Sequence, residues 1–185
     1  MKLINYLQNK PKRFLIFDLD ETLVKLDINW DLYRQKLWKE YGASRDIYSP
    51  NILQNELVTQ YGPDMVVSLK ELNNQFEKEN LKGYKVNDEL VKFVKNNKQY
   101  TYYLWTANTI ALAKKVLGEI GILDRFERIV SRDTVDYQKP NSEGFSQIYS
   151  KTESKNAYLF IGDSPTDKGA CGSAGIDFFA VTFFK

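Results

Sequence analysis

The sequence predicts an α/β fold: a Rossmann-like parallel sheet core with helices on both faces and a small inserted helical cap. From residue 86 onward, short apolar segments alternate with amphipathic segments that have a helical period. Strands separated by helices of this length indicate a mostly parallel sheet covered by helices. Between residues 25 and 85 the alternation stops, and only helical patterns follow one another. We therefore expect a core formed by 1–24 and 86–185 and a separate helical cap at 25–85.

The expected strands are short, apolar and rich in aromatic or β-branched residues. The first, RFLIFD, reads as a buried strand that ends in an acid, whereas ERIVS is the weakest of the set. In chain order the expected strands are 13–18, 100–106, 127–131, 157–163 and 178–184.

The expected helices follow from apolar residues that recur at intervals of three and four. In the cap, Trp30, Tyr33 and Leu37 show this spacing. In the core, Asn108 is a suitable N-cap for a helix that begins at 109, and Gly121 is a suitable residue to close it. In chain order the expected helices are 27–41, 51–61, 64–79, 87–97, 109–120, 142–150 and 165–174.

The composition excludes several classes of protein. No apolar run approaches the roughly 20 residues of a membrane span, and the first residues lack the apolar region of a secretory signal. A net charge of +2 is too small to indicate a nucleic-acid partner. The single cysteine, Cys171, cannot form an intrachain disulfide and fits the reducing cytoplasm, where we expect the protein to act.

Candidate ligand-binding residues follow four of the predicted strands, at the edge where an open parallel sheet binds its ligands. They are Asp18 and Asp20, then Thr106, Ala107 and Asn108, then Lys139, and finally Asp163 and Asp167. The chain has no histidine, so histidine-based catalysis and histidine metal sites are excluded. Crowded carboxylates repel one another unless a cation lies between them, and oxygen ligands alone favour Mg²⁺. Lys139 and the Thr106 hydroxyl could then hold an anion, a combination suited to phosphoryl transfer.

Each of these residues, taken alone, also has an ordinary structural explanation. Asp20 and Glu21 could be turn residues, and Ser164 with Asp167 forms a capping box at the start of a helix. A lone Lys139 would usually be a surface lysine. The joint occurrence of these groups, each after its own strand, favours the functional interpretation.

Four motifs, in order, resemble those of the haloacid dehalogenase-like (HAD) hydrolase superfamily. DLDET at 18–22 matches its motif D-x-D-x-T, and LWT, which ends at Thr106, matches the second motif. KP at 139–140 and IGDSPTD at 161–167 match the third and fourth. The resemblance covers nearly the whole core and implies that 25–85 is a helical cap of the family's C1 type.

The resemblance implies a role for each of these residues. Asp18 would be the nucleophile that becomes an aspartyl phosphate, and Asp20 would be the general acid and later the general base. The phosphoryl group would be bound by Thr106, Ala107 and Lys139. The magnesium ligands would be Asp18, the backbone carbonyl of Asp20, Asp163 and, directly or through water, Asp167.

The expected activity is therefore Mg²⁺-dependent hydrolysis of a small-molecule phosphomonoester. A phosphomutase of the same superfamily stays open, because it would use the same aspartyl phosphate. A phospho-acceptor signalling or regulatory protein is disfavoured, because receiver domains place their acid pair before the phospho-acceptor. Neither the substrate nor the oligomeric state follows from the sequence. Lys25, Arg34 and Arg45 are cationic candidates in the cap, although a solvated helix face explains each of them better.

Overall fold

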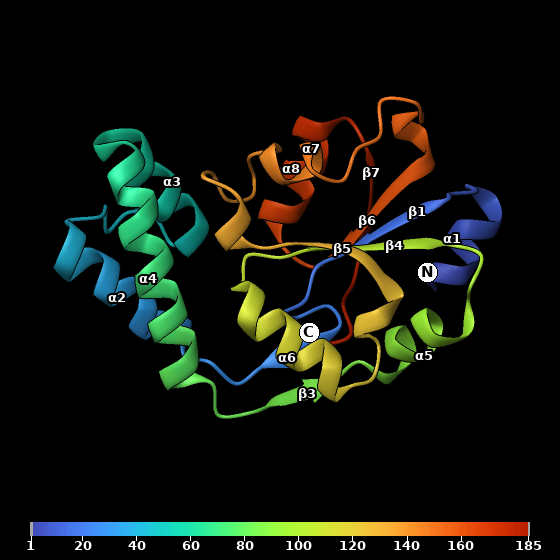
Figure 1. Ribbon diagram of the computed structural model, residues 1–185, viewed down its shortest axis with the longest axis horizontal. Helices are drawn as coiled ribbons and strands as arrows, with labels where there is room; N and C mark the ends of the chain where they lie inside the picture. The colour runs from blue at the N-terminus through green and yellow to red at the C-terminus, as the bar shows by residue number, and fades with distance from the viewer. Residues whose placement is uncertain (1, 185) are drawn as a thin grey trace.

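The computed structural model describes residues 2–184 and contains a five-stranded sheet in the order β5-β4-β1-β6-β7, with every strand parallel to its neighbours. The central strand β1 (Phe14–Phe17) lies between β4 (Thr101–Trp105) and β6 (Tyr158–Gly162). The edges are formed by β5 (Phe126–Val130) and β7 (Asp177–Ala180) (Figure 1). The predicted α/β fold class with a Rossmann-like parallel sheet is confirmed.

The sheet lies between two apolar layers, and side chains of β1 belong alternately to one layer and to the other. Leu15 and Phe17 belong to one buried cluster, whereas Phe14 and Ile16 belong to the other. Successive side chains of a strand point to opposite faces of its sheet, so all four residues of β1 are buried. A continuous apolar run is what a strand covered on both faces requires.

Helices cover both faces of the sheet (Figure 1). On one side, α5 (Asp88–Asn96) and α6 (Ile110–Glu119) contribute to the same cluster as Leu15. On the other side, the short α7 (Glu143–Ser146) and α8 (Pro165–Ala174) contribute to the cluster of Phe14. The remaining short helical turns are the 3₁₀ segments Leu123–Arg125, Arg132–Thr134 and Lys155–Ala157.

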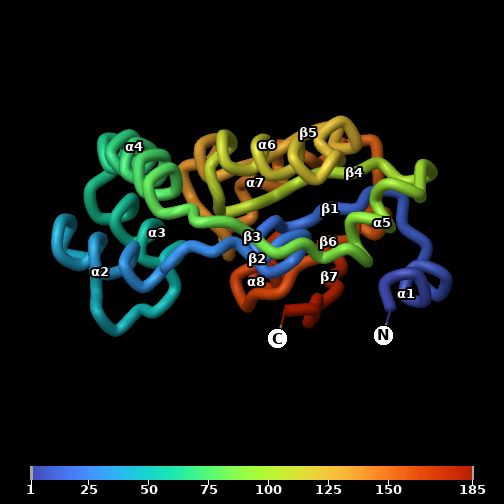
Figure 2. The backbone as a smooth tube through the Cα atoms, turned by 90° about the horizontal axis from the view of Figure 1, so that it is seen from below, coloured from blue at the N-terminus to red at the C-terminus, as the bar shows by residue number. Residues whose placement is uncertain are grey.

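Three further helices lie together at one end of the molecule, whereas the N-terminal α1 (Leu3–Asn9) lies at the other (Figure 2). They are α2 (Trp30–Tyr41), α3 (Pro50–Tyr61) and α4 (Pro63–Asn80). An antiparallel ribbon of β2 (Val24–Leu26) and β3 (Tyr84–Val86) connects them to the sheet. The expected boundaries at 24/25 and 85/86 fall within this ribbon, and the division into core and cap stays a prediction.

Two predicted elements extend four residues beyond the C-terminal ends that the structure gives them. The helix expected at 142–150 ends at Ser146, and the chain then turns so that Ser150 N–H donates to the Tyr158 hydroxyl at 3.1 Å. The strand expected at 178–184 ends at Ala180, because its partner β6 ends at Gly162. The helix α1 and the strands β2 and β3 were not predicted.

Among residues 2–184, no helix has both the length and the apolar character needed to cross a membrane.

Candidate active site

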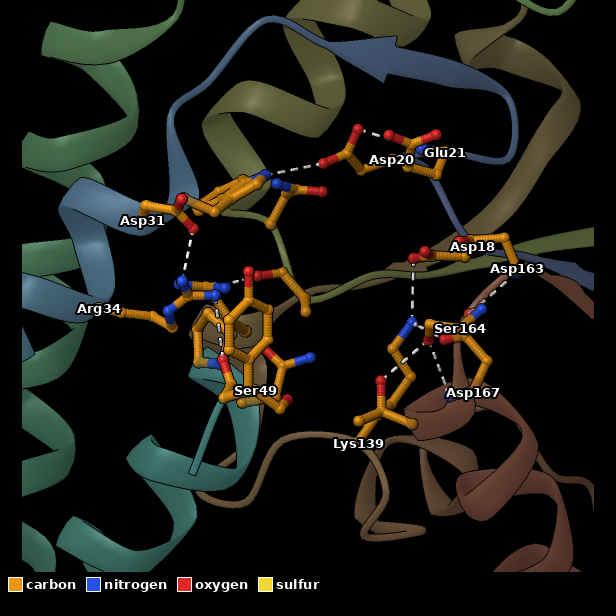
Figure 3. Close-up of a pocket in the computed structure, with 18 residues that line it drawn as sticks. Asp18, Asp20, Glu21, Asp31, Arg34, Ser49, Lys139, Asp163, Ser164 and Asp167 are labelled. Carbon is orange, nitrogen blue, oxygen red and sulfur yellow. Dashed lines mark hydrogen bonds and ion pairs between the residues drawn. The ribbon is translucent and has the colours of Figure 1, made fainter. Parts of the chain in front are cut away.

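Three carboxylates meet at the carboxyl edge of the sheet. Asp18 follows β1, Asp163 follows β6, and Asp167 lies in the first turn of α8. Since β1 and β6 are parallel neighbours, their carboxyl ends bring these residues to one place. One oxygen of each carboxylate lies within 4.8 Å of the others (Figure 3). This spacing is close enough for Asp18 and Asp163 to share one cation.

Asp167 has a structural role as well as a place in this cluster. It is the third helical residue of a capping box, in which the Ser164 hydroxyl accepts from Asp167 N–H at 3.1 Å. Its Oδ2 accepts from the backbone N–H groups of Ser164 at 3.0 Å and Asp163 at 3.2 Å. Its Oδ1 accepts from Lys139 Nζ at 2.6 Å. Both oxygens of this fully buried carboxylate are therefore engaged.

Lys139 lies among these acids and is only 3% exposed. Its Nζ donates to Asp18 Oδ1 at 2.9 Å, to Asp167 Oδ1 at 2.6 Å and to the carbonyl of Trp105 at 3.1 Å. Burial by itself would lower the pKa of Lys139, but the charges of Asp167 and Asp18 outweigh it and raise this pKa. Lys139 is therefore a fixed, permanently charged ammonium in the cluster.

Asp18 and Asp20 lie in different electrostatic environments. Burial raises the pKa of Asp18 to about 7, with Lys139 opposing the rise and Asp167 and Asp163 adding to it. Burial also raises the pKa of Asp20, to about 6, but here hydrogen bonds oppose the rise. Burial and, after it, the acidic neighbours therefore disfavour the charged form of Asp18, whereas Lys139 favours it.

The Asp20 carboxylate is held by three donors. Its Oδ1 accepts from the backbone N–H groups of Leu26 at 2.8 Å and Glu21 at 3.0 Å, and its Oδ2 accepts from Trp30 Nε1 at 3.0 Å. Glu21 has a left-handed backbone conformation with φ 56°, and in this conformation its N–H donates to the Asp20 side chain. Trp30 is the first residue of α2, so the helical end of the molecule contacts Asp20 directly.

The β4 loop, which we define as Thr106, Ala107 and Asn108, forms another part of the site. Ala107 and Asn108 line the pocket described below, whereas Thr106 is 2% exposed. The Thr106 hydroxyl donates to Asn108 Oδ1 at 2.9 Å and accepts from Asn108 N–H at 3.1 Å. No backbone carbonyl of residues 2–184 accepts a hydrogen bond from Ala107 N–H, so this donor is suited to an anion.

The predicted N-cap role of Asn108 is wrong. Thr109 is the N-cap of α6, and its hydroxyl accepts from Leu112 N–H at 3.3 Å. The Asn108 side chain instead bonds Thr106 and donates through Nδ2 to Glu77 Oε1 at 3.3 Å. Both Asn and Thr are favoured N-caps, so the residue types alone do not distinguish Asn108 from Thr109.

A pocket of about 490 Å³ joins the acid cluster to α2 and to the segment before α3. Of the cationic candidates in this region, Arg34 lines the pocket and is 7% exposed, whereas Arg45 is exposed. Arg34 donates to Asp31 Oδ1 at 2.6 Å, and its guanidinium lies 3.5 Å from the centre of the Tyr48 ring. Figure 3 shows Arg34 and Asp31 across the pocket from Lys139 and Asp167.

Arg132, a pocket residue that sequence reasoning missed, is 3% exposed. Its Nε donates to the carbonyl of Ala107, and its Nη1 donates to Asn73 Oδ1 at 2.7 Å. It is the second residue after β5, in the sequence SRD, but no pattern in the chain distinguishes it from a surface arginine. Its burial comes from the packing of α4 against the sheet edge.

Comparison with known proteins gives three kinds of similarity. The family model of the haloacid dehalogenase-like hydrolases matches residues 15–181. The chain is 27% identical over 198 residues to the pyrimidine 5'-nucleotidase PynA of Streptococcus pneumoniae, covering 89% of this chain and 81% of that protein. Solved structures of the same family also resemble it.

Two of these structures illustrate the shared fold. A haloacid dehalogenase-like hydrolase from Bacteroides fragilis has a TM-score of 0.70 and 18% identity over 92% of this chain and 88% of that one. The magnesium-bound hydrolase YfnB from Bacillus subtilis has a TM-score of 0.60 and 22% identity over 95% and 90%. With the family model matching most of the chain, the resemblance seen in the motifs is confirmed: the chain belongs to the haloacid dehalogenase-like hydrolase family, as an enzyme of the phosphatase type.

Proposed function

We propose that this enzyme is a Mg²⁺-dependent phosphomonoester hydrolase that works through an aspartyl phosphate on Asp18. The observation that carries this proposal is the cluster of Asp18, Asp163 and Asp167 around the ammonium of Lys139. A nucleophilic carboxylate, an anion-binding lysine and a cation site lie within one small space. Phosphoryl transfer needs chiefly such positioning and charge stabilisation.

The residues of the cluster fit Mg²⁺. The donor set contains only oxygens, and hard cations prefer such ligands. Asp18, Asp163 and the backbone carbonyl of Asp20 would hold the ion. Asp167 already uses both of its oxygens, so its approach through water is the simpler arrangement. Bound there, Mg²⁺ would neutralise the oxygens of the phosphoryl group.

In the first step, a carboxylate oxygen of Asp18 attacks phosphorus, and the bond from phosphorus to the alcohol oxygen breaks. Asp20 gives its proton to the departing oxygen. The pKa of about 6 suits this task, because part of the population carries the proton near neutral pH. Lys139 holds positive charge beside Asp18, which eases the approach of one anion to another.

In the second step, water attacks the phosphorus of the aspartyl phosphate, and Asp20 takes its proton. The bond from phosphorus to Asp18 breaks, which releases inorganic phosphate and restores the carboxylate. The phosphoryl oxygens would be bound by Lys139, Thr106 and the Ala107 N–H throughout. The same intermediate would serve a phosphomutase if a second hydroxyl replaced water.

For the substrate we propose a nucleoside monophosphate. The name of the Streptococcus pneumoniae relative supports this choice, and so does the wall opposite the acids. Tyr48 is 74% exposed while Arg34 covers one face of its ring, so the other face is suited to stack on a planar base. A pocket of about 490 Å³ is in the range that holds such ligands.

We further propose that the enzyme acts in the cytoplasm. Cys171, the only cysteine of the chain, is a buried free thiol. A reducing compartment keeps such a thiol in this state.

Variants of Asp18 and Asp20 test the mechanism. Asp18→Asn should form neither product nor phosphoenzyme, because the nucleophile is lost. Asp20→Asn should be about 10²–10⁴-fold slower with an alkyl phosphate. With p-nitrophenyl phosphate, whose leaving group needs no proton, it should give a burst of one p-nitrophenol per enzyme and trapped phosphoenzyme in rapid-quench measurements.

Two results would contradict the proposal. A burst from Asp18→Asn would mean that another residue is the nucleophile. Turnover of the wild-type enzyme that yields an isomer without free phosphate would identify a phosphomutase instead.

A further inference from the structure

A buried carboxylate on α4 contacts the β4 loop, although it has no part in the chemistry above. Glu77 is 2% exposed. Its Oε2 accepts from Thr109 N–H at 2.9 Å and from the Thr109 hydroxyl at 2.6 Å, and its Oε1 accepts from Asn108 Nδ2 at 3.3 Å. Burying a charge costs free energy unless the charged group is hydrogen-bonded. The hydrogen bonds of the two Glu77 oxygens therefore each need an explanation.

The bonds of Oε2 have a structural explanation. Thr109 is the N-cap of α6, and a carboxylate at a helix N-terminus binds an otherwise unpaired N–H and interacts favourably with the helix dipole. Burial raises the pKa of Glu77, whereas Arg132 and the donors from Thr109 and Asn108 oppose that rise. The two bonds of Oε2 go to Thr109 alone and concern the stability of α6.

The hydrogen bond between Glu77 Oε1 and Asn108 Nδ2 has a different consequence, because it determines the orientation of the Asn108 amide group. An ionised carboxylate can only accept hydrogen bonds, so the amide must turn its NH₂ group toward Glu77. Its Oδ1 then faces the Thr106 hydroxyl, which donates to it at 2.9 Å. The chain of bonds runs from Glu77 through Asn108 to Thr106.

We propose that Glu77 is a positioning residue for phosphoryl transfer, which holds the Thr106 hydroxyl in place through the Asn108 amide. This inference rests on the proposed function, in which Thr106 binds a phosphoryl oxygen. When that oxygen arrives, rotation of the O–H bond moves only the proton away from Asn108 Oδ1. The Thr106 oxygen also accepts from Asn108 N–H at 3.1 Å in this structure, and the oriented amide fixes the hydroxyl rotamer from which that rotation starts. The helix α4 thereby controls a ligand-binding group of the sheet edge.

The substitution Glu77→Gln tests this role without changing the size of the side chain. A glutamine can present its NH₂ group to Asn108, which favours the reversed amide and places a donor against the Thr106 oxygen. We expect kcat for p-nitrophenyl phosphate to fall about 10–100-fold, as for other residues that orient a binding group. Glu79→Gln is the matched control, since Glu79 is an exposed residue of the same helix, and its kcat should be unchanged.

A double-mutant cycle with Thr106→Val separates positioning from general stability. Thr106→Val alone should lower kcat about 10²–10³-fold, as the loss of one anion-binding donor does. If Glu77 acts through Thr106, adding Glu77→Gln to Thr106→Val should change kcat less than about twofold. Losses that multiply in the double variant would show that Glu77 only supports the fold, and would overturn the proposal.

A second control removes the structural role alone. Thr109→Val loses the hydroxyl bond to Glu77 and the N-cap, so Tm should fall, as N-cap loss typically costs about 1 kcal/mol, while kcat stays within about twofold.

If Glu77→Gln does not fold, Asn108→Ala replaces it in the cycle with the same expected result. Wild-type hydrolysis is measured first: its absence contradicts the proposed function, whereas multiplying losses in an active enzyme contradict only the role of Glu77.

Discussion

The two walls of the pocket are built in different ways. On the sheet side, Lys139 and Asp167 are almost fully buried, and each has at least three hydrogen bonds at its charged end or backbone. On the opposite side, Tyr48 is 74% exposed, and the side chain of Asp31, which pairs with Arg34, is 60% exposed. Preorganised charges suit the chemical step, whereas an open wall suits the choice of substrate. The comparison predicts that changes to Lys139 and Asp167 affect every substrate equally and that changes on the other side do not.

Removal of the metal should have the largest effect and should not depend on the substrate. EDTA should lower kcat at least about 10³-fold for alkyl and aryl phosphates alike, because a bound cation contributes several kcal/mol of charge stabilisation. Mg²⁺ should restore activity and Ca²⁺ should restore it poorly, since Ca²⁺ takes more and longer oxygen contacts. The measurement is phosphate release after chelation and metal addition, and full activity in EDTA would exclude the metal from the mechanism.

A change on the opposite wall should act on KM and depend on the substrate. Arg34→Met removes the guanidinium that supports the Tyr48 ring, so KM for a nucleoside monophosphate should rise about tenfold while kcat changes little, the size of a modest cation–π and packing loss. KM for p-nitrophenyl phosphate should stay the same. Arg45→Met is the control, because Arg45 is an exposed arginine of the same region. An equal rise for both substrates would mean that Arg34 only stabilises the fold.

The sheet-side wall could largely be predicted from the sequence, and the reason is geometric. Asp18 and Asp163 follow neighbouring parallel strands, so their meeting depends only on the strand order. Lys139 lies in the segment between β5 and α7, and Asp167 lies in the first turn of α8, so the family's motifs, rather than strand order alone, predicted these two residues. Their placement together is a finding of the structure, whereas their catalytic roles stay proposals.

The contacts of α4 could not be predicted, because they depend on packing between distant segments. Glu77 and Arg132 are charged residues in ordinary polar surroundings of the sequence, and charged residues are seldom fully buried. They become buried only when α4 lies against the β4 loop. The strands β2 and β3 have three residues each, which is too short for an alternating pattern to show.

Trp30 links the two walls, and its loss should have a smaller effect. In the wild type, the ring centres of Trp30 and Tyr33 are 6.1 Å apart. Trp30→Phe keeps an aromatic ring beside Tyr33 but removes the N–H group that donates to Asp20 Oδ2. A donor to a carboxylate lowers its pKa, so the pKa of Asp20 should rise above about 6. In the pH profile of kcat for an alkyl phosphate, the decline on the basic side should then occur about one pH unit higher.

Trp38→Phe is the matched control for this shift. The Trp38 indole N–H is buried and has no hydrogen-bond partner among the described residues, so its loss leaves Asp20 unchanged. An identical pH profile for Trp30→Phe and wild type would show that the bond to Asp20 does not affect its proton.

The smallest expected effect concerns the stability of the metal-free protein. Burial raises the pKa of Asp20 from 3.8 to about 6, so the folded state binds its proton more tightly than the unfolded state. This contribution to stability is fully present below pH 3.8 and is lost as pH rises through about 6. In EDTA, raising the pH from about 3.8 to above about 6 should therefore lower the Tm of the wild type by a few degrees more than that of Asp20→Asn. For a chain of this size, a free energy of about 1 kcal/mol corresponds to about 2–4 °C in Tm. Calorimetry of both proteins measures the difference. Parallel Tm curves would mean that Asp20 has its ordinary pKa in the folded enzyme, and its place as the acid of the first step would then need a proton supplied from elsewhere.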